Sequence, residues 1–128
     1  MNGCKALELY INETYAVDAE TPWAPDSDHA VFRHPNNRKW FAVLMTIPRA
    51  KLGLSGDGSI EVVNLKCGPI LAASLRSEAG FFPAWHMNKN HWITAALDGS
   101  ADAEQIKWLL EISWDLTGPK KKAPVSSN

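Results

Sequence analysis

Residues Phe81 to Trp92 read FFPAWHMNKNHW, and this segment indicates the fold more strongly than any other part of the chain. It places four phenylalanine and tryptophan rings, two histidines and a lysine within twelve positions. The two asparagines at its centre suit a turn, because asparagine tolerates the left-handed backbone conformation that tight turns require. The aromatic residues on either side favour strands. The segment therefore predicts a hairpin of two strands, at 81–86 and 91–97, with Trp92 and Phe82 turned inward.

A second hairpin is predicted earlier in the chain. Residues 29–34 and 39–47 are short runs rich in Val, Phe, Trp and Ile, and the Pro35-Asn36-Asn37 segment between them has the composition of a tight turn. Pro48 ends the second run, because proline has no N–H to donate to a neighbouring strand. A long loop with a Gly-Asp-Gly turn then leads to a third strand at 59–65.

The segment before the first strand predicts a helix followed by a loop. From Lys5 onward, apolar residues recur with a period of about 3.6 residues, which is typical of an amphipathic helix that covers one face of a sheet. Its apolar side comprises Ala6, Leu7, Tyr10, Ile11, Thr14 and Tyr15. Residues 18–28 concentrate Pro, Asp and Ser and form a loop, in which we expect Trp23 to fold back and plug an edge of the core.

Two further helices are predicted. One opens at Pro69, since proline is well tolerated at the first helical position, and it ends before Gly80. The other is capped by Asp102 or Ser100 and stops at Gly118. The apolar face of the last helix comprises Ile106, Leu109, Leu110, Ser113 and Trp114.

The predicted order of elements is α-β-β-β-α-β-β-α. Hairpins imply an antiparallel sheet, and helices packed on it define an α+β two-layer sandwich. A chain of 128 residues buries a sufficient core without disulfides. We therefore expect a single domain over residues 1–118 and a disordered tail over 119–128.

The composition restricts where the protein works and what it binds. The formal net charge is −1, so any nucleic-acid binding must come from a local basic patch. Cys4 and Cys67 are far apart in the chain and form no C-x-x-C motif, which fits a reducing compartment. No run approaches the roughly 18 apolar residues of a membrane-spanning helix. A cytoplasmic protein with no membrane partner is the expectation.

The four histidines raise a metal hypothesis. His29 and His34, like His86 and His91, are five positions apart, which places the two side chains of each pair on opposite faces of a strand. A turn could bring His86 opposite His91, but two imidazoles without a nearby cysteine or carboxylate make a weak site. We expect no metal.

Catalytic motifs are equally weak. Ser55 in GLSG does not match G-x-S-x-G, and the Gly56–Gly58 segment lacks the lysine of a phosphate-binding loop. Cys67 follows Lys66 and precedes a predicted helix, an environment that lowers a thiol pKa, although a cysteine at such a junction is more often packed than reactive. The sequence therefore predicts no catalytic residue, no cofactor and no enzymatic activity.

Four ordered motifs resemble the MmcQ/YjbR family, and together they cover roughly residues 20–117. They are NRKWFAVLM at 37–45, NLKCGP at 64–69, FPAWHMNKNHW at 82–92 and ISWDLT at 112–117. The resemblance implies a fold similar to the frataxin homologue CyaY and to secretion chaperones, and DNA binding through two hairpin wings. Iron binding of the CyaY kind would need a ridge of carboxylates, but the available acids do not recur on one helical face. These acids are Glu8, Glu13, Asp18 and Glu20.

Two binding functions stay open at this point. The first is nucleic-acid binding by a basic stripe along the hairpins, with Trp40, Trp85 or Trp92 stacking on bases. Its candidate residues are Arg38, Lys39, Lys66, His86, Asn88, Lys89 and His91. The second is a chaperone-like module for a protein partner, which requires an exposed apolar patch that includes Trp23, Trp85 or Phe81. Against both, tryptophans in the strands of a small domain are mostly core residues.

Overall fold

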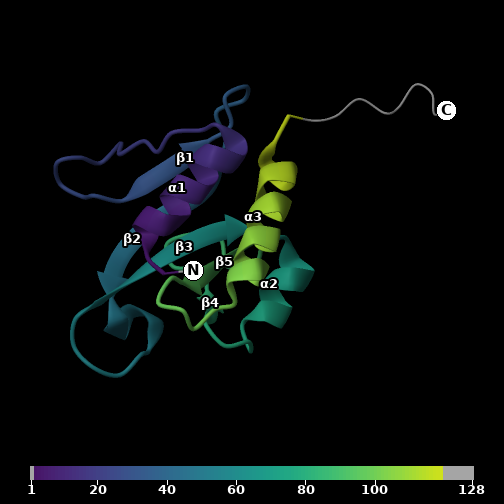
Figure 1. The fold of residues 1–128 in the computed structure, drawn as a ribbon. Helices are drawn as coiled ribbons and strands as arrows, with labels where there is room; N and C mark the ends of the chain where they lie inside the picture. Colours follow the sequence, from purple (N-terminus) through teal and green to yellow (C-terminus); the bar gives the residue numbers. More distant parts are fainter. Residues whose placement is uncertain (1, 120–128) are drawn as a thin grey trace.

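The computed structural model describes residues 2–119 as one five-stranded sheet with helices packed against it (Figure 1). Its elements are α1 (Cys4–Tyr15), β1 (Ala30–Arg33), β2 (Trp40–Pro48), the 3₁₀ helix η1 (Arg49–Leu52), β3 (Ser59–Lys66), α2 (Pro69–Leu75), β4 (Phe81–Pro83), β5 (Trp92–Ala96) and α3 (Ala103–Thr117). The strand order is β1-β2-β3-β5-β4, and every neighbouring pair is antiparallel. The predicted α+β class and order of elements are confirmed. The predicted tail lies outside the described residues, apart from Pro119.

The antiparallel pairing gathers three connections at one end of the sheet. There β1, β3 and β4 end, while β2 and β5 begin. We call this the hairpin end; it comprises the β1–β2 turn at 34–39, the exit of β3 at Lys66 and the β4–β5 loop at 84–91. The opposite end carries η1, the β2–β3 loop and the start of α1, where the Cys4 N–H donates to Glu61 Oε1 over 2.8 Å.

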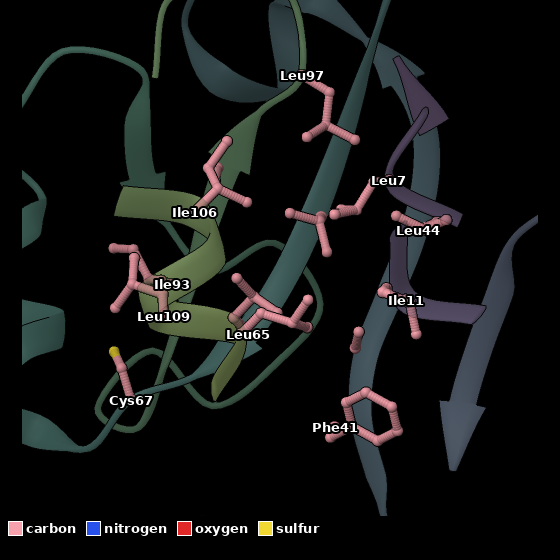
Figure 2. Close-up of a cluster of buried hydrophobic side chains, with 14 of the residues drawn as sticks. Leu7, Ile11, Phe41, Leu44, Leu65, Cys67, Ile93, Leu97, Ile106 and Leu109 are labelled. Atoms are coloured by element: carbon pink, nitrogen blue, oxygen red, sulfur yellow. The ribbon is translucent and has the colours of Figure 1, made fainter. Parts of the chain in front are cut away.

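One face of the sheet is covered by the helices and holds the main core (Figures 1 and 2). Leu7 and Ile11 of α1 are fully buried, as the predicted helical period requires. From α3, Ile106, Leu109 and Leu110 are fully buried on the same face. The predicted cap of α3 is confirmed, because the Asp102 carboxylate accepts the Gln105 N–H over 3.0 Å.

A bulge in β2 decides which side chains reach each face. Phe32 pairs with Ala42 but Arg33 pairs with Trp40, so Phe41 is an extra residue in the ladder. Phe41 and Ala42 therefore both belong to the core beneath the helices, while Trp40 packs on the opposite face. The buried Ser113 of α3 bridges the strands beside this bulge: its hydroxyl donates to the Phe41 carbonyl over 2.6 Å and accepts the Lys66 N–H over 3.0 Å.

The other face of the sheet is covered by loops, and we call it the loop face. It carries a second cluster of buried side chains, which comprises Val31, Val43, Met45, Ile47, Ile60, Val62 and Ala96. Leu52 and Leu54 pack on it from the β2–β3 connection, and Trp85 packs on it from the β4–β5 loop. Because short irregular segments cannot cover a sheet as fully as helices can, this face retains a cleft.

The aromatic hairpin is shorter than predicted. Strand pairing stops at Pro83 rather than at His86, because proline lacks the N–H that would continue the ladder. The next residues turn over the loop face, where the Trp85 N–H donates to the Thr94 hydroxyl over 3.0 Å. Phe81 is buried, so it cannot belong to an exposed apolar patch.

Trp23 also differs from its prediction. It does not plug the core; its side chain lies at the rim of the cleft and is 41% exposed. The loop that carries it is fastened to β1 by paired backbone hydrogen bonds between Glu20 and Val31. Among residues 2–119, no helix is both long enough and apolar enough to cross a membrane.

Candidate binding cleft

Val43, Met45 and Asn64 form the floor of the cleft on the loop face, and Thr94 lies beside Asn64 on the neighbouring strand. Val43 pairs with Asn64, and Asn64 pairs with Thr94 on the next strand. Asn64 and Thr94 are polar and fully buried, and a buried polar group is costly unless it is hydrogen-bonded. Asn64 Nδ2 donates to the Trp85 carbonyl over 2.8 Å, and the Thr94 hydroxyl donates to Asn64 Oδ1. The two polar side chains thus fix the start of the β4–β5 loop to the floor.

Aromatic side chains form two walls above this floor. On one side, Trp23 and Trp40 meet edge to face, with ring centroids 5.7 Å apart and planes at 80°. His29 stands against Trp23 at 6.4 Å. On the other side, the rings of Trp85 and His86 are 3.7 Å apart. Together with Met45, these residues line a cleft of about 740 Å³, a volume within the roughly 300–1,000 Å³ of small-molecule sites.

Two residues of the hairpin end, His86 in the cleft and Arg38 in the β1–β2 turn, have unusual backbone conformations. His86 has φ of 61° and Arg38 has φ of 64°, both in the left-handed region that residues other than glycine rarely adopt. Such conformations persist where the surrounding structure enforces them, and they cluster at binding sites. The hydrogen bonds that hold Trp85 to the floor fix the residue that directly precedes His86.

A cationic group stands beside the Trp40 wall. The Arg33 guanidinium lies 5.6 Å from the Trp40 ring centroid, in cation–π contact. Glu20 binds both Arg33, over 3.2 Å, and Arg38, over 2.9 Å. Glu20 therefore belongs to a network with arginines and not to a carboxylate ridge of the kind that iron would need.

The structure brings some of the predicted site residues together and separates others. Arg38, Lys39 and Lys66 all lie at the hairpin end, and His86 lines the cleft. Asn88, Lys89 and His91 belong to the second half of the β4–β5 loop, which turns toward α2. There the His91 carbonyl accepts the N–H groups of Cys67 and Gly68, and the Lys89 carbonyl accepts a hydrogen bond from Arg76.

The sequence did not predict that several residues would lie in or beside the cleft. Asn64 lies within the otherwise apolar run IEVVNLK, and a single amide in a strand that is buried on both faces is a sign of a specific hydrogen-bonded role. Thr94 interrupts the run in β5 in the same way. His29 and Met45 carried no such sign, because their part in the cleft depends on segments distant in the chain.

The thiols do not have the properties of nucleophiles. Burial raises the pKa of Cys67 to about 11 and that of Cys4 to about 12. The activating environment considered for Cys67 is therefore not found: removal from water outweighs the nearby lysine and helix. In the described part of the chain, no three His, Cys, Asp or Glu side chains gather closely enough to hold a metal ion.

A second hollow, of about 830 Å³, lies along the exposed side of α1. Its lining runs from Lys5 to Asn12 and adds Asp18 and Ala19 from the following loop. It has neither aromatic walls nor histidines. The cleft on the loop face is therefore the better candidate for a binding site.

Fold and cleft together define a small α+β protein with a helix-covered sheet face and an open aromatic face, and comparison with known proteins identifies its family. The family model described as YjbR matches residues 12–116. The chain belongs to the YjbR family, so the resemblance in the sequence motifs is confirmed.

Two curated relatives support this assignment. The uncharacterized protein YyaQ of Bacillus subtilis is 36% identical over 108 residues, which cover 84% of this chain and 92% of that protein. The uncharacterized protein YjbR of Escherichia coli K12 is 43% identical over 53 residues, which cover 41% of this chain and 45% of that protein.

Solved structures agree with the fold. A crystal structure of a Pseudomonas syringae protein superposes with a TM-score of 0.88 at 44% identity, over 92% of this chain and all of that one. A Deinococcus radiodurans protein with a DUF419 domain superposes with a TM-score of 0.69 at 24% identity, over 98% of this chain and 85% of that one. The second likeness is one of fold alone.

Proposed function

We propose that this protein is a non-enzymatic nucleic-acid-binding protein that contacts phosphates through its hairpin end. One observation carries the proposal: the antiparallel topology brings the β1–β2 turn, the end of β3 and the β4–β5 loop to the same end of the sheet. Each of these segments presents a basic side chain, Lys39, Lys66 and Lys89 in turn. The chain has no net positive charge, so local gathering of this kind is what phosphate binding requires.

These lysines differ from the neighbouring arginines in their salt bridges. Arg33 and Arg38 share the single carboxylate of Glu20, whereas Lys39, Lys66 and Lys89 form no salt bridge within residues 2–119. The β1–β2 turn and the β4–β5 loop join the two pairs of strands at opposite edges of the sheet, so their midpoints are three strand spacings, or roughly 14 Å, apart. Contacts to separate phosphates along a backbone, one for each lysine, suit this geometry better than a single phosphate does.

The absence of catalysis and the cytoplasmic location are parts of the same proposal. Thiols with raised pKa values are poor nucleophiles, which supports a binding role. Both cysteines are free, which supports a reducing compartment.

A salt titration with random-sequence duplex DNA tests the proposal. We expect binding at about 50 mM salt, with log affinity falling against log salt by a slope of about −3 for three phosphate contacts. The double variant Lys66→Ala, Lys89→Ala should reduce the slope by about 2 and retain the fold.

The matched control is the double variant Lys5→Ala, Lys51→Ala, which removes the same charge from exposed positions at the opposite end of the sheet. It should leave the slope unchanged. Absence of duplex binding at low salt, or an equal loss in both double variants, would overturn the proposal.

A second candidate is a binding module for a protein partner, and the exposed rim of the cleft favours it. Trp23 is 41% exposed and Trp85 is half-buried beside it, as an apolar patch for a partner would require. This candidate predicts affinity that depends weakly on salt and is lost when Trp85 is replaced by alanine.

A further inference from the structure

We infer that the aromatic cleft on the loop face binds a single nucleobase. The inference deepens the proposed function and rests on it: the hairpin end holds phosphates, and the cleft beside it takes an unstacked base. Every base offers a flat ring that stacks on tryptophan, together with edge groups that donate and accept hydrogen bonds.

The cleft supplies both kinds of contact. Trp40 and Trp85 stand on different walls above a floor in which Val43 and Met45 supply apolar side chains beside Asn64. At the rim, the imidazoles of His29 and His86 make no hydrogen bond within residues 2–119, so their nitrogens are available to the edge of a ring. Flat faces with polar groups at the margin match a heteroaromatic base better than an aliphatic side chain.

The charges beside the cleft decide between ligands of similar shape. A cage of tryptophans with one carboxylate, Asp26, would also suit a quaternary ammonium ion. Here the Arg33 guanidinium already lies against the Trp40 ring, and a second cation would be repelled. Lys39 directly precedes Trp40, the first residue of β2. Lys66 follows Asn64 by two positions in β3. Cations that flank an aromatic slot favour a base joined to a phosphate.

One wall of the cleft is also held in place before any ligand binds. The Trp85 wall is fixed by two hydrogen bonds to the fully buried pair Asn64 and Thr94. A wall that is fixed before the ligand arrives loses little conformational entropy on binding. This accounts for an amide and a hydroxyl in the middle of a buried sheet, where apolar residues would otherwise pack.

The experiment compares two single strands of about twelve nucleotides with equal charge, an oligothymidylate and an abasic strand that has the same phosphates but no bases. We expect the thymidylate strand to bind at least about tenfold more tightly, the contribution of one base stacked on an aromatic side chain. Trp23→Ala should abolish the preference for the thymidylate strand over the abasic strand. Trp108→Ala, which removes another exposed tryptophan, from α3 on the helix-covered side, should preserve the preference.

A free nucleoside monophosphate distinguishes the two sources of the base. Shifts of the His29 and His86 ring signals in NMR spectra, lost in Trp23→Ala, would support a base site open to free nucleotides. If only the oligothymidylate produces them, the ligand is a base within a strand. Equal affinity for the two strands, together with no response to the monophosphate, would overturn the inference.

The failures of the two proposals can be told apart. Equal binding of abasic and base-containing strands, with the expected salt slope, would leave phosphate binding intact and remove the base site. A response to the monophosphate without binding of any strand or duplex would remove the proposed function and keep the base site.

Discussion

The two faces of the sheet are covered by different kinds of structure. The helix-covered face is closed by α1, α2 and α3 and is filled almost entirely by apolar side chains. The loop face is closed only in part, by short irregular segments, and contains a buried polar pair and three tryptophans around a cleft. The contrast leads us to expect that most of the stability comes from the face under the helices, whereas the proposed binding site lies on the face under the loops.

The largest expected effect tests the stability half of this contrast. Phe41 is fully buried beneath the helices, against Tyr15, Trp114 and His34. Phe41→Ala should lower the free energy of unfolding by about 3–5 kcal/mol, because it leaves a cavity that this packed region cannot refill. Denaturant unfolding measures the loss. Trp23→Ala, on the open face, should cost less than about 1 kcal/mol, and similar losses in the two variants would contradict the division between the faces.

A smaller effect tests the buried polar pair. Thr94→Val keeps the shape of the side chain but removes the hydroxyl that accepts the Trp85 N–H and donates to Asn64. We expect a loss of about 1–3 kcal/mol, the cost of leaving buried polar groups without partners. Hydrogen exchange at the Trp85 amide should accelerate.

The control for this variant is Thr46→Val, at an exposed position of β2. It should change the stability by no more than about 0.5 kcal/mol. Unchanged exchange at Trp85 in Thr94→Val would show that something other than the polar pair fixes the wall of the cleft.

The smallest effect concerns pH and falls on the helix-covered side. His34 is buried, its Nε2 lies 3.0 Å from the Thr117 hydroxyl, and burial lowers its pKa below the ordinary value despite the opposing influences of a Trp114 backbone hydrogen bond and of Asp115. In the unfolded chain it titrates near about 6.5. Stability is therefore complete above that pH and declines below it, because the unfolded chain binds a proton that the folded protein excludes.

Denaturant midpoints measured between about pH 7.5 and pH 5 would show this decline. His34→Phe should flatten the profile over this range, whereas His91→Gln, at an exposed position, should not. A profile that stays equally steep in His34→Phe would assign the pH dependence to other groups.

The order of elements could be predicted from the sequence because each signal is local. The spacing of Leu7 and Ile11 predicts the buried side of α1, and Asp102 predicts the start of α3. The family motifs were recognisable for the same reason, since each is a continuous segment. The basic residues were also visible, although Lys89 and His91 turn toward α2 and leave His86 in the cleft without them.

The cleft could not be predicted, because its members come together only through long-range contacts. Trp23 reaches Trp40 across the first hairpin, and Trp85 reaches Asn64 on β3, 21 positions away. Sequence patterns place a tryptophan in a strand or a loop but do not state which distant side chain it meets. The bulge at Phe41, which sends Trp40 to the loop face, depends on the register between strands and on Ser113 of α3.

The sequence by itself determined the helices, the strands and the antiparallel class of this protein, because these follow from local periodicity and turn chemistry, and its continuous motifs indicated the family by resemblance. In the segment from Phe81 to Trp92, for example, two asparagines between aromatic residues predicted a hairpin. Only the tertiary structure decided that its Trp85 is fixed over a buried amide and hydroxyl, and that three tryptophans from three segments surround one cleft. The physical reason is that packing and polar burial depend on side chains far apart in the chain, and no local pattern encodes them.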